Sequence, residues 1–118
     1  MRDYLLALPL PAQPAADAAD AAQPALVARG RALFFDETVG CASCHKDAIL
    51  SDGAAHEVGS GVKLDTPSLR FVAGTAPYFH DGRYATLREL LEATAGTMGW
   101  RRLDKPQLEA MEAYLRTL

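Results

Sequence analysis

The strongest constraint on this chain is a five-residue segment, CASCH at 41–45. It holds the only two cysteines of the 118 residues, three positions apart, with a histidine directly after the second. At this spacing each thiol can form a thioether with a vinyl group of one haem, and the next imidazole can then reach the iron. The segment predicts one covalently attached haem c, bound by Cys41 and Cys44, with His45 as an axial iron ligand.

Three other sites are compatible with a pair of nearby cysteines. A structural zinc site needs four sulfur or imidazole ligands, and beyond 41–45 the chain offers only the distant His56 and His80. A thioredoxin-like dithiol belongs with a βαβ pattern, which this sequence lacks. A plain disulfide would not require the histidine. The haem hypothesis is favoured because it uses all three residues.

The length leaves room for one domain and a tail. Residues 11–25, PAQPAADAADAAQPA, predict a linker, either extended or transiently helical. Residues 1–10 contain RDYLLAL, which echoes the chain's own end and suggests the close of a helix from a preceding domain. We therefore expect the monohaem domain to cover residues 26–118.

Three helices are expected. The first runs from Pro24, which suits a first turn, to Phe35. The second begins after Thr86, in a T-x-x-E capping pattern, and continues until Gly96. Asp104 can cap the third, which has an apolar stripe and continues to the chain's end.

The middle of the chain, residues 41–85, is broken by glycines and prolines. We expect loops there, with at most a short hairpin near 50–63. A domain of this size has a small core, so a bound group at its centre would add to its stability.

Several segments resemble a known family. They are ARGRALFF at 28–35, HEVGSG at 56–61, DTPSLR at 65–70, TAPYFHDGR at 75–83 and YLRTL at 114–118. With the CASCH motif, they make the chain similar to class I cytochrome c domains, and among these to the C-terminal haem domain of the bacterial dihaem cytochrome c peroxidase and MauG-type family. The resemblance implies an all-α cytochrome c-like fold, with three main helices and long loops wrapped around the haem. It also implies that the first and last helices cross, with Gly30 allowing close approach of Tyr114 or Leu115.

The resemblance further implies a methionine as sixth iron ligand, after the 75–83 segment. Met98 is the candidate, because the glycines of GTMGW at 96–100 let the backbone approach a haem face. Met111 falls on the apolar stripe of the last helix and is assigned to the core. In the peroxidases themselves the methionine stands at the position of Thr94, whereas related cytochrome domains have a G-x-M-G loop.

Other polar residues have weaker claims to the haem. His80 is interpreted as hydrogen-bonded within its turn and His56 as a loop-bracing residue, with iron ligation as the alternative for each. Arg70 could neutralise haem propionates, as could Arg101 and Arg102, which could equally be solvated. Trp100 could stack near the haem edge or pack in the core.

The favoured function is a one-electron relay through a haem ligated by His45 and Met98, serving redox protein partners or a larger complex, without enzyme activity of its own. The alternative is the electron-supplying half of a dihaem peroxidase or MauG-like oxidase. Thioether attachment takes place outside the bacterial cytoplasm, so we expect a periplasmic or otherwise external location, although no export signal is visible in this chain.

Charge and hydropathy exclude other partners. The net charge of −3 argues against nucleic acid. No apolar run approaches the roughly 18 residues of a membrane span. The one basic stretch, residues 83–105, is a candidate docking surface for an acidic partner.

Overall fold

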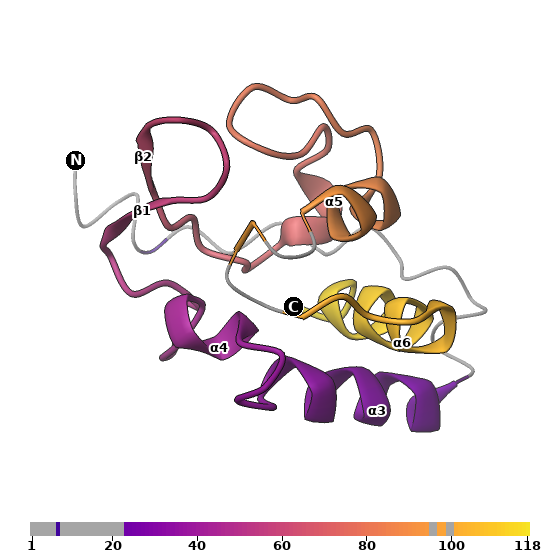
Figure 1. Ribbon diagram of the computed structural model, residues 1–118. Coiled ribbons are helices and arrows are strands. Elements are labelled where there is room, and N and C mark those ends of the chain that lie inside the picture. The colour runs from indigo at the N-terminus through magenta and orange to yellow at the C-terminus, as the bar shows by residue number, and fades with distance from the viewer. Residues whose placement is uncertain (1–6, 8–22, 95–96, 99–100) are drawn as a thin grey trace.

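The computed structural model describes Ala7 and residues 23–94, 97–98 and 101–118. Within these residues the fold is mostly helical (Figure 1). The α-helices are α3 (Pro24–Phe34), α4 (Cys41–Cys44), α5 (Leu87–Ala93) and α6 (Lys105–Leu115). One 3-10 turn, η1 (Val72–Gly74), and two strands, β1 (Ala55–Glu57) and β2 (Lys63–Asp65), complete the elements. The three expected helices are present, and the structure adds a fourth at the CASCH motif.

The short hairpin expected near 50–63 exists but reaches further along the chain. β1 and β2 pair antiparallel, with His56 opposite Leu64. Among the described residues, the other loops between the helices contain only η1 and an isolated bridge between Tyr78 and Tyr84. The expected all-α fold therefore needs one correction, because the domain also contains a small antiparallel hairpin.

Helices α3 and α6 lie side by side at the base of Figure 1. Gly30 of α3 faces Ala110 and Tyr114 of α6. The Phe34 and Tyr114 rings pack with their centroids 5.4 Å apart. The expected approach of the last helix to Gly30 is confirmed for Tyr114, and Ala110 comes closer still.

The helix ends follow local sequence signals. At α6, Asp104 accepts a hydrogen bond from the Gln107 backbone and the Gln107 side chain accepts one in return, which forms a capping box. At α5, Thr86 accepts from the Glu89 backbone N–H. α5 ends at Ala93, before Gly96, which lies outside the described residues.

The CASCH motif is helical rather than part of a loop. Gly40, in the left-handed conformation at φ 88°, turns the chain into α4. The Ser43 hydroxyl donates to the Gly40 carbonyl at 2.6 Å, and the His45 backbone N–H donates to the Cys41 carbonyl at 3.0 Å. One helical turn therefore brings both cysteines and the histidine to the same end of the domain.

An ionic network joins the two C-terminal helices. Arg88 of α5 contacts Glu112 of α6 at 2.7 Å, and Arg116 contacts the other oxygen of the same carboxylate at 2.8 Å. All three side chains are half-buried, so the pairs are screened less than surface pairs. The network holds α5 against α6 beside the core.

The expected N-terminal segments lie almost wholly outside the described residues. Of the predicted preceding-domain end at 1–10 and linker at 11–25, the structure describes Ala7 and residues 23–25, with Pro24 beginning α3. None of the described helices has the length and apolar character that crossing a membrane requires.

Candidate functional site

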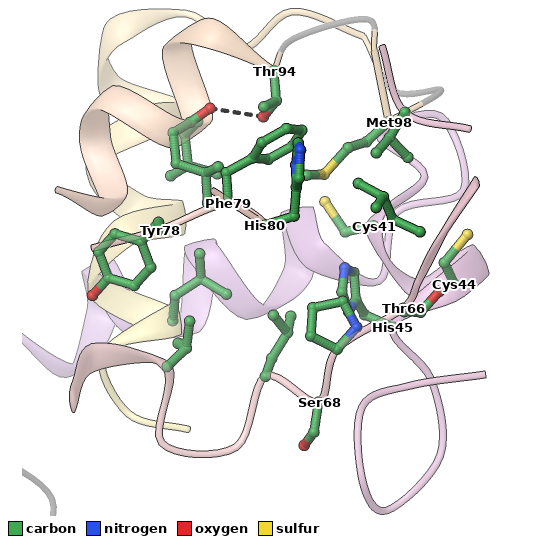
Figure 2. A pocket seen from close by; sticks show the side chains of 18 of the residues that line it. Cys41, Cys44, His45, Thr66, Ser68, Tyr78, Phe79, His80, Thr94 and Met98 are labelled. Atoms are coloured by element: carbon green, nitrogen blue, oxygen red, sulfur yellow. Dashed lines mark hydrogen bonds between the residues drawn. The ribbon is translucent and has the colours of Figure 1, made fainter. Parts of the chain in front are cut away.

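A cavity of about 380 Å³ opens at the centre of the domain, within the usual size range of ligand pockets (Figure 2). Its wall comes from α4, the hairpin, the 64–80 loops, α5, the Met98 turn and α6. Most of its lining side chains are apolar. Cys41, Cys44, His45 and Met98 all line it, so the structure brings together the four residues predicted to hold a haem.

The two cysteines stand half-buried at the edge of this cavity, both as free thiols. Burial raises the pKa of Cys41 to about 11. Without a bound group, its side chain is therefore a neutral thiol at physiological pH.

His45 is held in one orientation by a backbone carbonyl. Its Nδ1 lies 3.1 Å from the Leu50 carbonyl oxygen, which can only accept, so this contact favours the tautomer with the proton on Nδ1. Burial lowers the pKa of His45, which favours the neutral ring. A neutral imidazole whose second nitrogen is fixed by a carbonyl is the form that ligates a metal.

The carbonyl that orients His45 comes from a tight loop that the sequence did not reveal. Asp47 and Leu50 both adopt left-handed backbone conformations, at φ 63° and 55°. The Ser51 backbone N–H closes the loop by donating to the Lys46 carbonyl at 3.0 Å. Neither left-handed residue is a glycine, so no local signal marked this turn.

Met98 lies on a short turn that follows α5. The Thr97 backbone N–H and hydroxyl both donate to the Thr94 carbonyl, at 3.0 and 2.9 Å. Thr94 is buried and also lines the cavity, and its hydroxyl donates to the Leu90 carbonyl, drawn as a dashed line in Figure 2. Met98 is half-buried against the core.

Met111 is fully buried in the core, as expected, although it also forms part of the cavity wall. Trp100, the candidate for the haem edge, lies outside the described residues. Met98 is only partly buried and borders the open space, as do the alternative ligands His56 and His80.

His56 braces its loop, as the sequence analysis expected. Its Nε2 lies 2.7 Å from Asp52, and the Ala54 backbone N–H donates to the same carboxylate at 2.9 Å. These two contacts lower the pKa of Asp52 to about 2, and the hydrogen bond from Ala54 has the larger effect. Ligand atoms of Cys44, Asp52 and His56 lie within 4.8 Å of one another. Cys41 and His45 do not join this group, so the four-ligand zinc alternative gains no support in the described residues.

The turn from Pro77 to Tyr84 carries two aromatic side chains to the cavity. Tyr78 and Tyr84 exchange backbone hydrogen bonds of 2.7 and 3.3 Å across its base. The Phe79 and His80 rings contact edge to face, with centroids 4.7 Å apart. His80 makes no hydrogen bond within the described residues, so the expected hydrogen bond inside the turn is replaced by this ring contact.

The predicted cationic partners of the propionates lie away from the wall. Arg70 is exposed and is not among the described residues that line the cavity, and neither is Arg101 or Arg102. Arg101 instead approaches the Thr38 hydroxyl at 3.4 Å, beside the loop that enters α4. The role of Arg70 stays a prediction.

This donor set fits haem c. Two thiols at one rim, a neutral oriented imidazole and a thioether side chain border one largely apolar space. The model of the family described as di-haem cytochrome c peroxidase, CCP_MauG, matches residues 24–117. The chain belongs to this family. Members bind c-type haem and act as redox proteins, and the C-x-x-C spacing of Cys41 and Cys44 agrees with that attachment.

Curated relatives of this family member are distant and longer. Hydrazine synthase subunit gamma of Kuenenia stuttgartiensis is 24% identical over 76% of this chain and 40% of its own length. Cytochrome c551 peroxidase of Nitrosomonas europaea is 27% identical over 67% of this chain and 30% of its own. The methylamine utilization protein MauG of Methylorubrum extorquens is 31% identical over 54% and 23%. The chain thus spans less than half of each relative.

Solved structures agree on the fold. A MauG-like protein associated with microbial copper homeostasis superimposes with a TM-score of 0.68, and hydrazine synthase of Kuenenia stuttgartiensis with 0.66. Each is 24% identical and covers 79% of this chain and 46% of the other. The fold of this domain is therefore shared with about half of each of those chains.

Proposed function

We propose that this chain binds one haem c through thioethers from Cys41 and Cys44, with His45 and Met98 as its axial ligands. The observation that carries the proposal is the convergence of these four residues on one apolar cavity. The neutral, carbonyl-oriented ring of His45 supports ligation on one side. The partly buried thioether of Met98, on a turn anchored to Thr94, supports ligation on the other.

When bound, the haem supplies a one-electron redox couple. The chain's residues set its properties. Apolar lining side chains exclude water, which favours the less charged reduced state, and a thioether ligand raises the reduction potential relative to a second imidazole. The Leu50 carbonyl holds the His45 proton on Nδ1, so that ring stays oriented in both redox states.

We further propose that the domain is the electron-supplying half of a dihaem peroxidase- or MauG-like oxidoreductase. Family membership over residues 24–117 supports this, as do relatives that are a peroxidase and MauG. The chain carries one C-x-x-C-H motif, so a second haem would have to be bound by another segment or chain. If His45 and Met98 both ligate the iron here, the peroxide-reactive haem would be that second one.

A relay serving other redox proteins, without a peroxidase half, is the second candidate. The position of Met98 favours this candidate. In the peroxidases the methionine is expected at the position of Thr94, and Met98 stands four residues later. Under either proposal the partner is a redox protein or complex, and the domain works outside the cytoplasm, where haem c is attached.

The test begins with the chain produced together with a haem c maturation system. We expect pyridine haemochrome to give one c-type haem per chain, and the haem to stay with the polypeptide after acid–organic extraction. Free haem in the organic phase, or a folded colourless protein from the cytoplasm, would refute covalent attachment.

Stopped-flow mixing with peroxide then separates the two roles. Under both, the isolated ferrous domain should turn over peroxide negligibly. The electron-supplying role predicts fast peroxide reduction when a second, open-coordinated haem domain is added, whereas a relay exchanges electrons with its partner and produces no peroxide turnover. Rapid turnover by the isolated chain would contradict both.

A further inference from the structure

We infer that Gly59, in the loop between β1 and β2, is a positioning residue for Met98. The inference rests on the proposed ligation by His45 and Met98 and deepens it. The juxtaposition that carries it is the contact of Gly59 with Thr97, the residue directly before the proposed ligand.

The space beside Gly59 is filled by Thr97. A β-carbon built at Gly59 would lie 3.1 Å from Cγ2 and 3.2 Å from Cβ of Thr97. Both distances are shorter than ordinary carbon–carbon contact, which is about 3.5–4.0 Å. The Thr97 Cβ cannot rotate away, because it is bonded to the backbone. A side chain at position 59 would therefore require Thr97 or the hairpin loop to shift by a few tenths of an ångström.

Thr97 is also fixed from its other side. Its backbone N–H and its hydroxyl both donate to the Thr94 carbonyl, and Thr94 is buried at the end of α5. The turn is thus held between α5 and the hairpin loop. If a side chain at position 59 displaces Thr97, and the bonds to Thr94 resist that displacement, the next residue, Met98, is displaced as well.

The hairpin loop is a firm support. The Gly61 backbone N–H donates to the Glu57 carboxylate at 2.9 Å, and the Ser60 hydroxyl donates to the Val62 carbonyl at 2.7 Å. Val58 also lines the cavity. The same loop therefore forms part of the cavity wall and sets the position of the Met98 turn.

The chain offers a matched control two residues away. Gly59 and Gly61 have similar left-handed backbones, at φ +86° and +79°, so alanine costs similar backbone strain at both. A β-carbon at Gly61 would meet nothing within 4 Å. A difference between Gly59→Ala and Gly61→Ala therefore reports the Thr97 contact.

The experiment uses holoprotein of both variants and wild type. In Gly59→Ala we expect the charge-transfer band of Met-ligated ferric haem to weaken. We also expect cyanide to bind about tenfold faster, which corresponds to an activation free energy lower by about 1.4 kcal/mol. In Gly61→Ala the band should persist, with cyanide binding within about twofold of wild type. Equal behaviour of the two variants would overturn the inference.

Two further variants test the same contact from Thr97. In Gly59→Ala/Thr97→Gly both close carbon atoms of residue 97 are gone, so the added methyl should weaken the band no further than Thr97→Gly does alone; a further loss would contradict the inference. Thr97→Gly removes the contact and the hydroxyl bond without altering Gly59, so it serves even where Gly59→Ala yields no holoprotein. It too should weaken the band, and a wild-type band there would overturn the inference.

Failure of this inference is distinguishable from failure of the ligation itself. If wild type lacks the methionine band, or Met98→Ala keeps it, the proposed ligation fails. If wild type has the band and Met98→Ala loses it, while Gly59→Ala behaves like Gly61→Ala, only the role of Gly59 fails.

Discussion

A β-carbon built at Gly30 would lie 1.8 Å from the carbonyl oxygen of Ala110 and 2.7 Å from the β-carbon of Tyr114. The first of these atoms belongs to the backbone of α6, so it cannot move without the helix. Gly30 is buried in the middle of α3. The contact between the two helices depends on the absence of a side chain at this one position.

Gly30→Ala should therefore destabilise the domain, although alanine is the better helix former. We expect a loss of about 3 kcal/mol in the free energy of unfolding, at the upper end of the range for overpacked cores. The control is Ala28→Gly at an exposed site of α3, which should cost about 1 kcal/mol through helix propensity. Denaturant unfolding of the holoproteins measures both. A smaller loss at Gly30 than at Ala28 would contradict the close packing.

Met98→Ala should open one axial position of the haem. We expect loss of the charge-transfer band and rapid binding of cyanide, whereas Met98→His should remain six-coordinate at a lower potential within the roughly 0.8 V range that axial ligands span. The control Met111→Leu conserves volume in the fully buried core and should keep the band. Persistence of the band in Met98→Ala, with its loss in Met111→Leu, would transfer the ligand role to Met111.

Asp52→Asn should change the acid stability. The folded-state pKa of Asp52, about 2, is below the ordinary value of 3.8, so its carboxylate stabilises the fold above pH 3.8. That contribution is lost as the pH falls from 3.8 to 2. Asp52→Asn should therefore be less stable than wild type at pH 7, and the difference should shrink to near zero at pH 2.

Denaturant unfolding of Asp52→Asn and of wild type across pH 2–7 measures the effect. A constant difference between the two over this range would exclude the predicted linkage.

Docking to an acidic partner should depend on Arg101 and Arg102. The basic stretch at 83–105 has a net charge of +2, but two of its arginines are already paired with carboxylates. Arg83 pairs with Asp81 at 2.6 Å, and Arg88 pairs with Glu112. Arg101 and Arg102 are exposed, and Arg101 lies beside the loop that leads to Cys41. Both are therefore candidates to steer an acidic partner toward this end of the domain.

We expect Arg101→Gln/Arg102→Gln to slow electron exchange with an acidic redox partner by about threefold at low ionic strength, with the difference vanishing near 1 M salt. Arg29→Gln/Arg31→Gln removes the same charge from α3 and should change the rate less. Stopped-flow rates against salt measure both. Equal slowing by the two pairs would assign the effect to net charge alone.

The parts of this protein that its sequence determined are those governed by near neighbours. The C-x-x-C-H spacing alone puts two thiols and an imidazole within five residues, whereas the helical turn of α4 that carries Cys41 and Cys44 was not predicted. The caps at Thr86 and Asp104 depend on residues three positions away, and both formed as predicted. Pro24 began its helix for the same local reason.

Tertiary structure decided what depends on segments that are distant along the chain or on unmarked backbone turns. The Leu50 carbonyl reaches His45 because two non-glycine residues adopt left-handed conformations, which no residue type announced. Gly59 meets Thr97 only because the loop between β1 and β2 and the segment after α5, distant along the chain, lie together in the fold. Such contacts depend on the path of whole loops, and a loop's path is set by everything it packs against.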